Sequence, residues 1–206
     1  MPTQTRRISG IAVALLVVLL VIAVGLRVAQ GQAQHVSWDI VSVNFPTTTV
    51  SPGGVAFAQA PNHEAPATLW RIRLTGSGTF VSPASGRSTG AVTGGGTWQT
   101  SVGATLTGSG TYRVTELSSW ELANFAVGGP PIDLTGDRDA RANGNAVLRI
   151  QYSDGSDGIL GIGCHGPGAP NGIVEGVIAT KDHVTYWFAE PPLPNVDLNR
   201  TLFHVN

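Results

Sequence analysis

A short phrase, glycine followed by threonine and an aromatic residue, occurs three times between positions 73 and 114 and constrains the fold more than any other feature. The copies are Gly78–Phe80, Gly96–Trp98 and Gly110–Tyr112. A β-branched residue beside an aromatic one fits a pleated, half-buried surface, whereas the glycines around it are typical of turns and bulges. The phrase therefore predicts consecutive antiparallel strands, each with its aromatic side chain in the core.

Apolar and polar residues alternate in several further segments, as they do in strands that bury one face. The clearest segment is 146–152, where four apolar residues share one face while Arg149 and Gln151 lie on the other. Turn-forming sequences separate these segments, and no helical period follows Gly31. We predict an all-β domain, a single antiparallel β-sandwich or β-barrel of about ten strands.

Residues 1–34 read as a targeting segment with a short linker, and residues 35–206 read as the β domain. Arg6 and Arg7 precede an uncharged, mostly apolar run over 11–26, which predicts an N-terminal hydrophobic helix. The run is intermediate in length between a signal peptide and a membrane span, so a cleaved signal and an uncleaved membrane anchor both stay open. Either alternative predicts a domain outside the cytoplasm, secreted or held at the cell membrane.

The charge of the chain excludes one large class of partner. Its 206 residues include 12 basic and 13 acidic side chains, a formal net charge of −1. Nucleic-acid binders usually present a basic surface, so nucleic acid is not an expected partner. The single cysteine, Cys164, cannot form an internal disulfide, so the domain has to be stabilised by its packed core.

Cys164 and His165 end a predicted strand and open a glycine-rich loop, a position where functional residues are common. Cys164 follows Ile162 on one face of the strand, which predicts a buried structural cysteine. A thiolate nucleophile is the alternative. Adjacent strand residues point to opposite faces, so the base for such a nucleophile would have to be His183 or His63 rather than His165.

Glu175 belongs to a predicted strand over 173–180, where it shares a face with aliphatic residues. An apolar pocket would raise the pKa of its carboxyl and suit it to acid–base work, whereas a position at the rim of the sheet is the simpler explanation. Antiparallel pairing could also bring His165, Glu175 and His183 together as a metal site with two histidines and one carboxylate.

The segment 128–145 reads as the longest irregular connection, and it carries Asp133, Asp137 and Asp139. Their carboxylates could bind Ca²⁺, which prefers oxygen ligands, but Arg141 occupies the next ligand position of an EF-hand-like loop. A solvated loop is therefore expected here, and no cofactor or metal is predicted.

Five stretches in the last third of the chain resemble a known family. They are Leu148–Gly155, Cys164-His165, Val174–Gly176, Ala179–Lys181 and Asn199–Phe203. These segments resemble a family of uncharacterised, exported bacterial all-β proteins with no known activity. The resemblance implies an exported bacterial β domain, and it transfers no site residue.

Together these observations predict a non-enzymatic extracytoplasmic domain that binds a ligand or partner, or that serves structurally at the envelope. Five tryptophans in a strand-rich chain allow an aromatic pocket for a small apolar ligand. The alternative is an enzyme of hydrolase or isomerase type that uses Glu175, His183 and the Cys164-His165 loop. The sequence contains no phosphate loop, dinucleotide fingerprint, metalloprotease motif or nucleophile elbow, which counts against the commonest enzyme classes.

Overall fold

The computed structural model describes residues 33–61, 65–82 and 91–206. The predicted N-terminal hydrophobic helix and His63 lie outside these described residues, so the targeting segment stays a prediction. Across the described ranges, no helix has the length and apolar character that a membrane crossing requires. Residues Gln34–Asn206 form a unit with its own internal contacts.

The described part of this unit is all β, as predicted, with fourteen strands and one short 3₁₀ helix, η1 (Arg138–Ala140). The strands are β1 (Gln34–Asn44), β2 (Thr49–Pro52), β3 (Ala56–Gln59), β4 (Trp70–Leu74), β5 (Ser77–Ser82), β6 (Val92–Val102), β7 (Thr105–Phe125), β8 (Ile132–Asp133), β9 (Arg141–Tyr152), β10 (Asp157–Cys164), β11 (Gly176–Lys181), β12 (Val184–Tyr186), β13 (Phe188–Ala189) and β14 (Thr201–Val205). The structure has more strands than the ten or so predicted, because short strands such as β8 and β13 form within segments that were expected to be loops.

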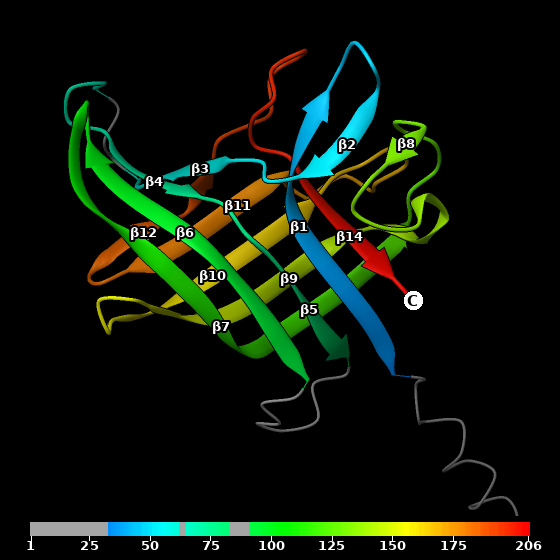
Figure 1. Ribbon diagram of the computed structural model, residues 1–206. Helices are drawn as coiled ribbons and strands as arrows, with labels where there is room; N and C mark the ends of the chain where they lie inside the picture. The colour runs from blue at the N-terminus through cyan, green and yellow to red at the C-terminus, as the bar shows by residue number, and fades with distance from the viewer. Residues whose placement is uncertain (1–32, 62–64, 83–90) are drawn as a thin grey trace, which may run out of the picture. The chain divides into compact units, whose positions relative to one another are not determined.

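Six of the strands close into a barrel (Figure 1). β9 pairs with β14, β14 with β1, β1 with β5, β5 with β6 and β6 with β7, and β7 pairs again with β9, always antiparallel. The sequence left a sandwich and a barrel open, and the structure is a barrel with additional strands. Closure pairs both edges of every strand in the ring.

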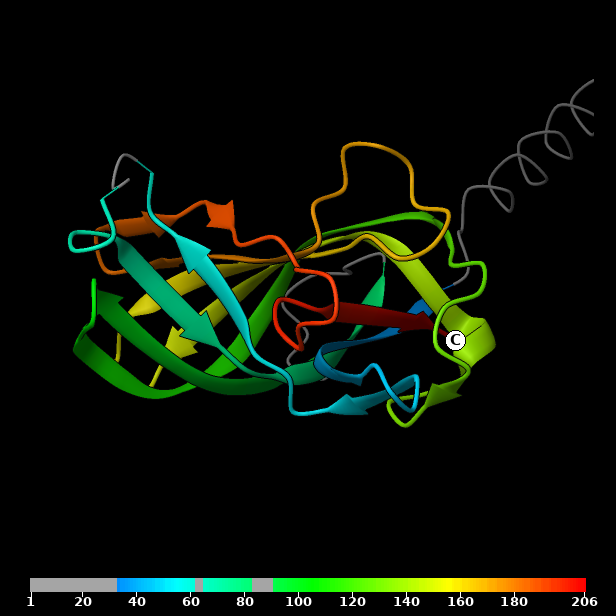
Figure 2. The ribbon, with the colours of Figure 1, turned by 90° about the horizontal axis from the view of Figure 1, so that it is seen from above.

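The remaining strands extend this ring on two sides. β10, β11 and β12 continue the sheet from β9, whereas β4, β3 and β13 continue it from β6. Residues of β11 lie close to β3, so the two extensions meet. Seen from above, the loop that joins β10 to β11 stands out from the rest of the unit (Figure 2).

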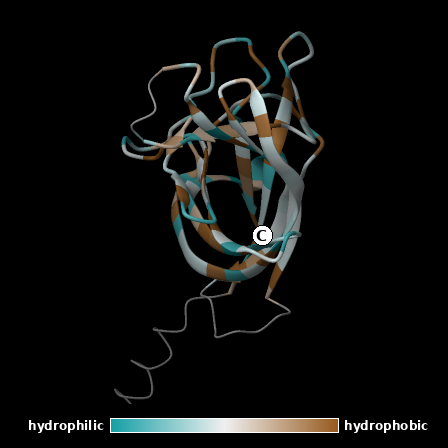
Figure 3. Ribbon diagram, turned by 90° about the vertical axis from the view of Figure 1, so that its left-hand side faces the viewer, coloured by the Kyte–Doolittle hydropathy of each residue, from teal (hydrophilic) through white to brown (hydrophobic). Residues whose placement is uncertain are grey.

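The three Gly-Thr-aromatic phrases lie in neighbouring antiparallel strands, β5, β6 and β7, as predicted. Phe80, Trp98 and Tyr112 are only 1%, 4% and 4% exposed, which confirms them as core residues. The rings of Trp98 and Tyr112 both meet Tyr152 of β9 edge-on. Hydrophobic and hydrophilic segments alternate along the strands in Figure 3, and in 146–152 the predicted apolar face is buried.

Candidate functional site

The ends of several strands surround an apolar pocket. Its lining comes from the last residues of β1 and β10, from the segment after β7, and from the first residues of β9 and β14. This barrel-end pocket has a volume of about 280 Å³ and mostly apolar walls. Its lining includes Val41, Val43, Val50, Arg141, Cys164, His165, Glu175, Arg200 and Leu202. Three residues singled out from the sequence therefore meet in one place.

Glu175 lies in the bend immediately before β11, which begins at Gly176. The prediction of a strand over 173–180 is therefore wrong for residues 173–175. One carboxylate oxygen accepts the N–H of Thr201 (2.8 Å) and lies 3.3 Å from the Thr201 hydroxyl, which donates to the carbonyl oxygen of Gly163 at 2.6 Å. The other oxygen accepts the N–H of His165. Burial raises the pKa of this carboxyl, while these hydrogen bonds and the charge of Arg200 oppose the rise. Glu175 thus ties the β10–β11 connection to the start of β14.

Cys164 is buried at the end of β10, as predicted. Its Sγ lies 3.4 Å from the carbonyl oxygen of Thr201. Burial, followed by the negative charge of Glu175, raises the pKa of the thiol. The neighbouring His165 ring is engaged elsewhere, because its Nδ1 lies 2.8 Å from the carbonyl oxygen of Ile173. These contacts are those of a structural cysteine.

We expect the Cys164 thiol to react with a thiol reagent at neutral pH far more slowly in the folded domain than in the urea-unfolded chain. The raised pKa keeps the thiol protonated, and burial excludes the reagent. Cys164→Ser should lower the free energy of unfolding by about 1–3 kcal/mol, because the shorter hydroxyl lies farther from its acceptor. Mass spectrometry after labelling and urea titration measure the two effects. Equal labelling rates in the folded and unfolded states would contradict a buried thiol.

His183 does not join this group. It is exposed in the turn between β11 and β12, at the opposite end of β11 from Glu175. The structure therefore does not bring His183 together with His165 and Glu175. Over the ranges that the structure describes, no three His, Cys, Asp or Glu side chains are placed to hold a metal ion.

The three aspartates of the acidic segment have different surroundings. Asp137 accepts the N–H of Asp139 (2.9 Å) at the start of η1, and both residues are exposed. The Asp133 side chain is only 1% exposed, and its Oδ2 lies 2.5 Å from Arg141 Nε and 3.1 Å from His204 Nε2. The expectation of a solvated loop is wrong for Asp133, because a buried ion pair ties this part of the segment to β9 and β14.

A second buried carboxylate, Asp39 of β1, faces the same cluster. Burial raises its pKa to about 6, an effect that the charge of His204 opposes and that of Asp133 reinforces. For Asp133, burial alone would raise the pKa, but hydrogen bonds from Thr135, Arg141 and His204 outweigh it and lower the pKa to about 2. Asp133 is therefore ionised at neutral pH at little cost, whereas ionising Asp39 costs free energy.

Two arginines that the sequence did not single out also line the barrel-end pocket. Arg141 Nη1 donates to the carbonyl oxygen of Pro130 (2.9 Å), and Arg200 Nη2 donates to that of Leu193 (3.0 Å). Among the described residues, neither Arg141 Nη2 nor Arg200 Nε has a hydrogen-bond partner, although both atoms are buried. Buried donors are normally paired, so these two N–H groups are exceptions within the described part of the chain, and neither atom has appreciable accessible surface.

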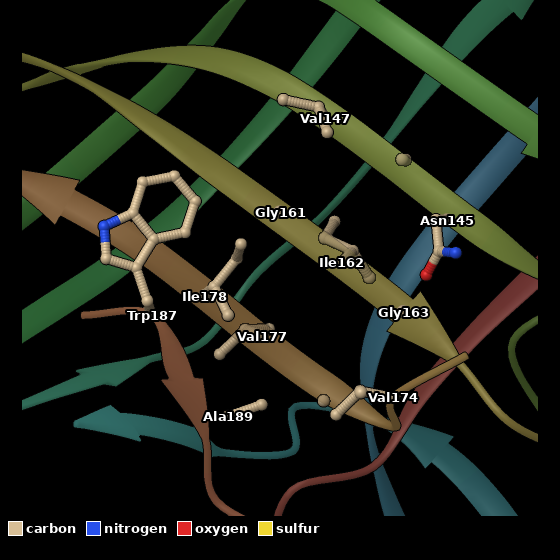
Figure 4. A pocket seen from close by; sticks show the side chains of 12 residues that line it. Asn145, Val147, Gly161, Ile162, Gly163, Val174, Val177, Ile178, Trp187 and Ala189 are labelled. Carbon is tan, nitrogen blue, oxygen red and sulfur yellow. The ribbon is translucent and has the colours of Figure 1, made fainter. Parts of the chain in front are cut away.

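A second cavity, of about 320 Å³, lies over β9, β10 and β11 (Figure 4). Gly161 and Gly163 provide no side chains to cover the sheet there, and Trp187 stands at one end with 52% of its surface exposed. The walls are apolar apart from the Asn145 amide, and no charged side chain of the described chain lines this groove. This second cavity therefore differs from the barrel-end pocket, whose lining includes both arginine and glutamate side chains.

Comparison of the chain with protein-family models, curated proteins and solved structures gives no match.

Proposed function

We propose that this chain is an extracytoplasmic, non-enzymatic β domain whose barrel-end pocket binds a small, mostly apolar ligand. The observation that carries the proposal is a cavity of about 280 Å³ with valine and leucine walls and a few charged groups. Small-molecule sites combine apolar walls with a small number of placed polar groups in this way. The extracytoplasmic location is supported by the targeting pattern of residues 1–30.

The contacts at the pocket favour binding over the enzyme alternative. A cysteine nucleophile needs a base within hydrogen-bond reach. The Cys164 thiol donates to the carbonyl oxygen of Thr201, and the backbone groups of Phe203 and Gly166 also interact with its sulfur, so its partners are main-chain groups. Both oxygens of Glu175 already accept hydrogen bonds from the protein. These groups fix the walls of the pocket.

The volume limits the size of the ligand. An apolar cavity of about 150 Å³ accommodates a benzene molecule, so roughly twice that volume suits a ligand of about ten non-hydrogen atoms. Octan-1-ol is a probe of this size without a charge.

The test is a titration of the isotope-labelled domain with octan-1-ol, followed by NMR. We expect saturable shifts confined to residues that line the barrel-end pocket. Val43→Trp fills space in that pocket and should weaken binding by at least about tenfold. Val184→Trp in β12 is the matched control, because both valines are partly buried against the core but Val184 lies outside the pocket.

Two results would contradict the proposal. The first is the absence of saturable shifts at the pocket with octan-1-ol and with charged molecules of the same length. The second is equal weakening by Val43→Trp and Val184→Trp, since a site elsewhere or a loss of folding would then explain both.

A further inference from the structure

We infer that the segment 126–140 is a pH-responsive cover, which is held closed while a proton on Asp39 balances the buried charges beneath it and is loosened when that proton is lost. The charges form a buried cluster of four side chains: Asp39, Asp133, Arg141 and His204. The inference goes beyond the proposed function, because it concerns the local stability of one segment and requires no ligand.

The segment 126–140 has no large apolar side chain in the core. Its larger apolar side chains are exposed: Val127, Ile132 and Leu134. Polar contacts hold it instead, because Arg141 of β9 pairs with Asp133 and donates to the carbonyl oxygen of Pro130 (2.9 Å). A pairing of two residues between β8 and β2 adds to these contacts. A segment with so few buried apolar contacts can open locally while the rest of the domain stays folded.

The segment passes directly over the buried cluster. A side-chain carbon added at Gly136 would lie 2.9 Å from the His204 ring, so the backbone of the segment lies against the imidazole. His204 belongs to β14, which pairs with β1 and places Leu202 opposite Asp39. Opening of the segment therefore admits water to the cluster and lowers the cost of ionising Asp39.

The charges of the cluster balance only when it carries one added proton. Two ionised carboxylates bring two negative charges, and Arg141 brings one positive charge. A buried charge without a counter-charge is costly, so the closed segment favours the state with the added proton. Asp133 accepts hydrogen bonds from Thr135, Arg141 and His204. Asp39 has no such support, and burial raises its pKa to about 6, so Asp39 holds the proton.

The surrounding elements supply no other buried charge to Asp39. The strands β2 and β5, which pair with β1, contain no charged side chain, and β14 contains none besides His204. Further titratable or charged residues near this face are exposed, or held by another group in the case of the last: His35, Asp137, Arg138, Asp139 and Arg200.

The direction of the pH effect follows from the two states of the segment. In the open state Asp39 meets water, where the pKa of an aspartate is about 4, whereas in the closed state its pKa is about 6. The proton therefore favours the closed state at acidic pH, and this advantage is lost as the pH rises through about 6. Gly128, Gly129 and Pro130 of the segment also line the barrel-end pocket, so the same proton affects one of its walls.

The test is hydrogen–deuterium exchange of the full chain at pH 4.5 and pH 8, followed by mass spectrometry and corrected for the intrinsic pH dependence of exchange. We expect the protection of peptides from 126–140 to fall roughly 30-fold between these pH values, as the two pKa values of Asp39 require. Peptides of β10 report on global unfolding and should stay more protected than the segment at both pH values.

Asp39→Asn keeps the cluster free of the second negative charge. It should abolish the pH difference and hold the segment at pH 8 near the protection of the unmodified chain at pH 4.5. His35→Gln is the matched control, because it removes an exposed ionisable side chain from the same strand and should leave the difference unchanged.

Three results would overturn the inference. They are equal protection of the segment at the two pH values, a pH difference that persists in Asp39→Asn, and a segment that is as protected as β10. The first and third results come from the unmodified chain, so the comparison decides the question even if Asp39→Asn does not fold.

Discussion

Asp133→Asn is expected to lower the free energy of unfolding by about 3–5 kcal/mol, because it leaves a buried arginine without its counter-charge. The Asp133 and Arg141 side chains are 1% and 3% exposed, so water cannot replace the lost partner. His204, 1% exposed, loses an acceptor at the same time. The folded pKa of about 2 is depressed, so this stabilisation is present above the unfolded pKa and is lost as the pH falls through about 2. Urea titration at pH 7 measures the change.

Asp139→Asn is the matched control, because this side chain is 81% exposed and its ion pair with Arg138 should contribute little. A loss of less than about 1 kcal/mol for Asp133→Asn would show that the buried pair does not stabilise this part of the fold.

Asp39→Asn should have the opposite effect and raise the free energy of unfolding at neutral pH. The folded pKa of Asp39 is raised to about 6, so the folded state binds a proton more tightly than the unfolded chain does. Its favourable contribution is complete below the unfolded pKa and disappears as the pH rises through about 6. At pH 7, Asp39→Asn should therefore stabilise the domain by up to about 3 kcal/mol, and the gain should vanish near pH 4. Destabilisation at both pH values would refute this account of the cluster.

Phe80→Ala is expected to cost about 3–5 kcal/mol, the usual range for a fully buried aromatic residue. Its ring lies 5.4 Å from that of Trp120, which in turn lies 4.7 Å from Phe203, so the contact links β5, β7 and β14 of the barrel. The change in near-ultraviolet circular dichroism during urea unfolding reports on this aromatic group. Leu106→Ala is the control, since Leu106 is 59% exposed on β7 and should change stability by no more than about 0.5 kcal/mol. Similar losses for the two variants would mean that Phe80 is not a core residue.

The sequence was most informative where one face of a strand meets the core. In 146–152 the period of two identified the buried side chains correctly, and in the three Gly-Thr-aromatic phrases the aromatic residue type did so. The same reasoning fails at Asp39, which alternates like a solvent-facing residue and is only 8% exposed. Asp133, whose charge acts on Asp39, lies about ninety residues away in the sequence, and alternation within one strand carries no information about such distant neighbours.

The candidate site was predictable in part for the same reason. Cys164, His165 and Glu175 come from one hairpin connection, so local sequence brings them together. Arg141 and Arg200 reach the pocket only because β14 pairs with both β1 and β9, and that pairing depends on barrel closure. The two residues that donate backbone N–H hydrogen bonds to Glu175 show the same division: His165 is a local contact, and Thr201 is a contact made across the fold.

The pairing of β1 with β14 also sets an order of events during synthesis. Ile40 lies opposite Thr201, so the strand made first waits for roughly 160 residues of further chain, or some ten to thirty seconds at ordinary elongation rates. Until then one edge of β1 is open, and Glu175 lacks the Thr201 partner that fixes it. The barrel-end pocket is thus among the last features to form, and a nascent chain has to be kept from pairing its open β1 edge with that of another molecule.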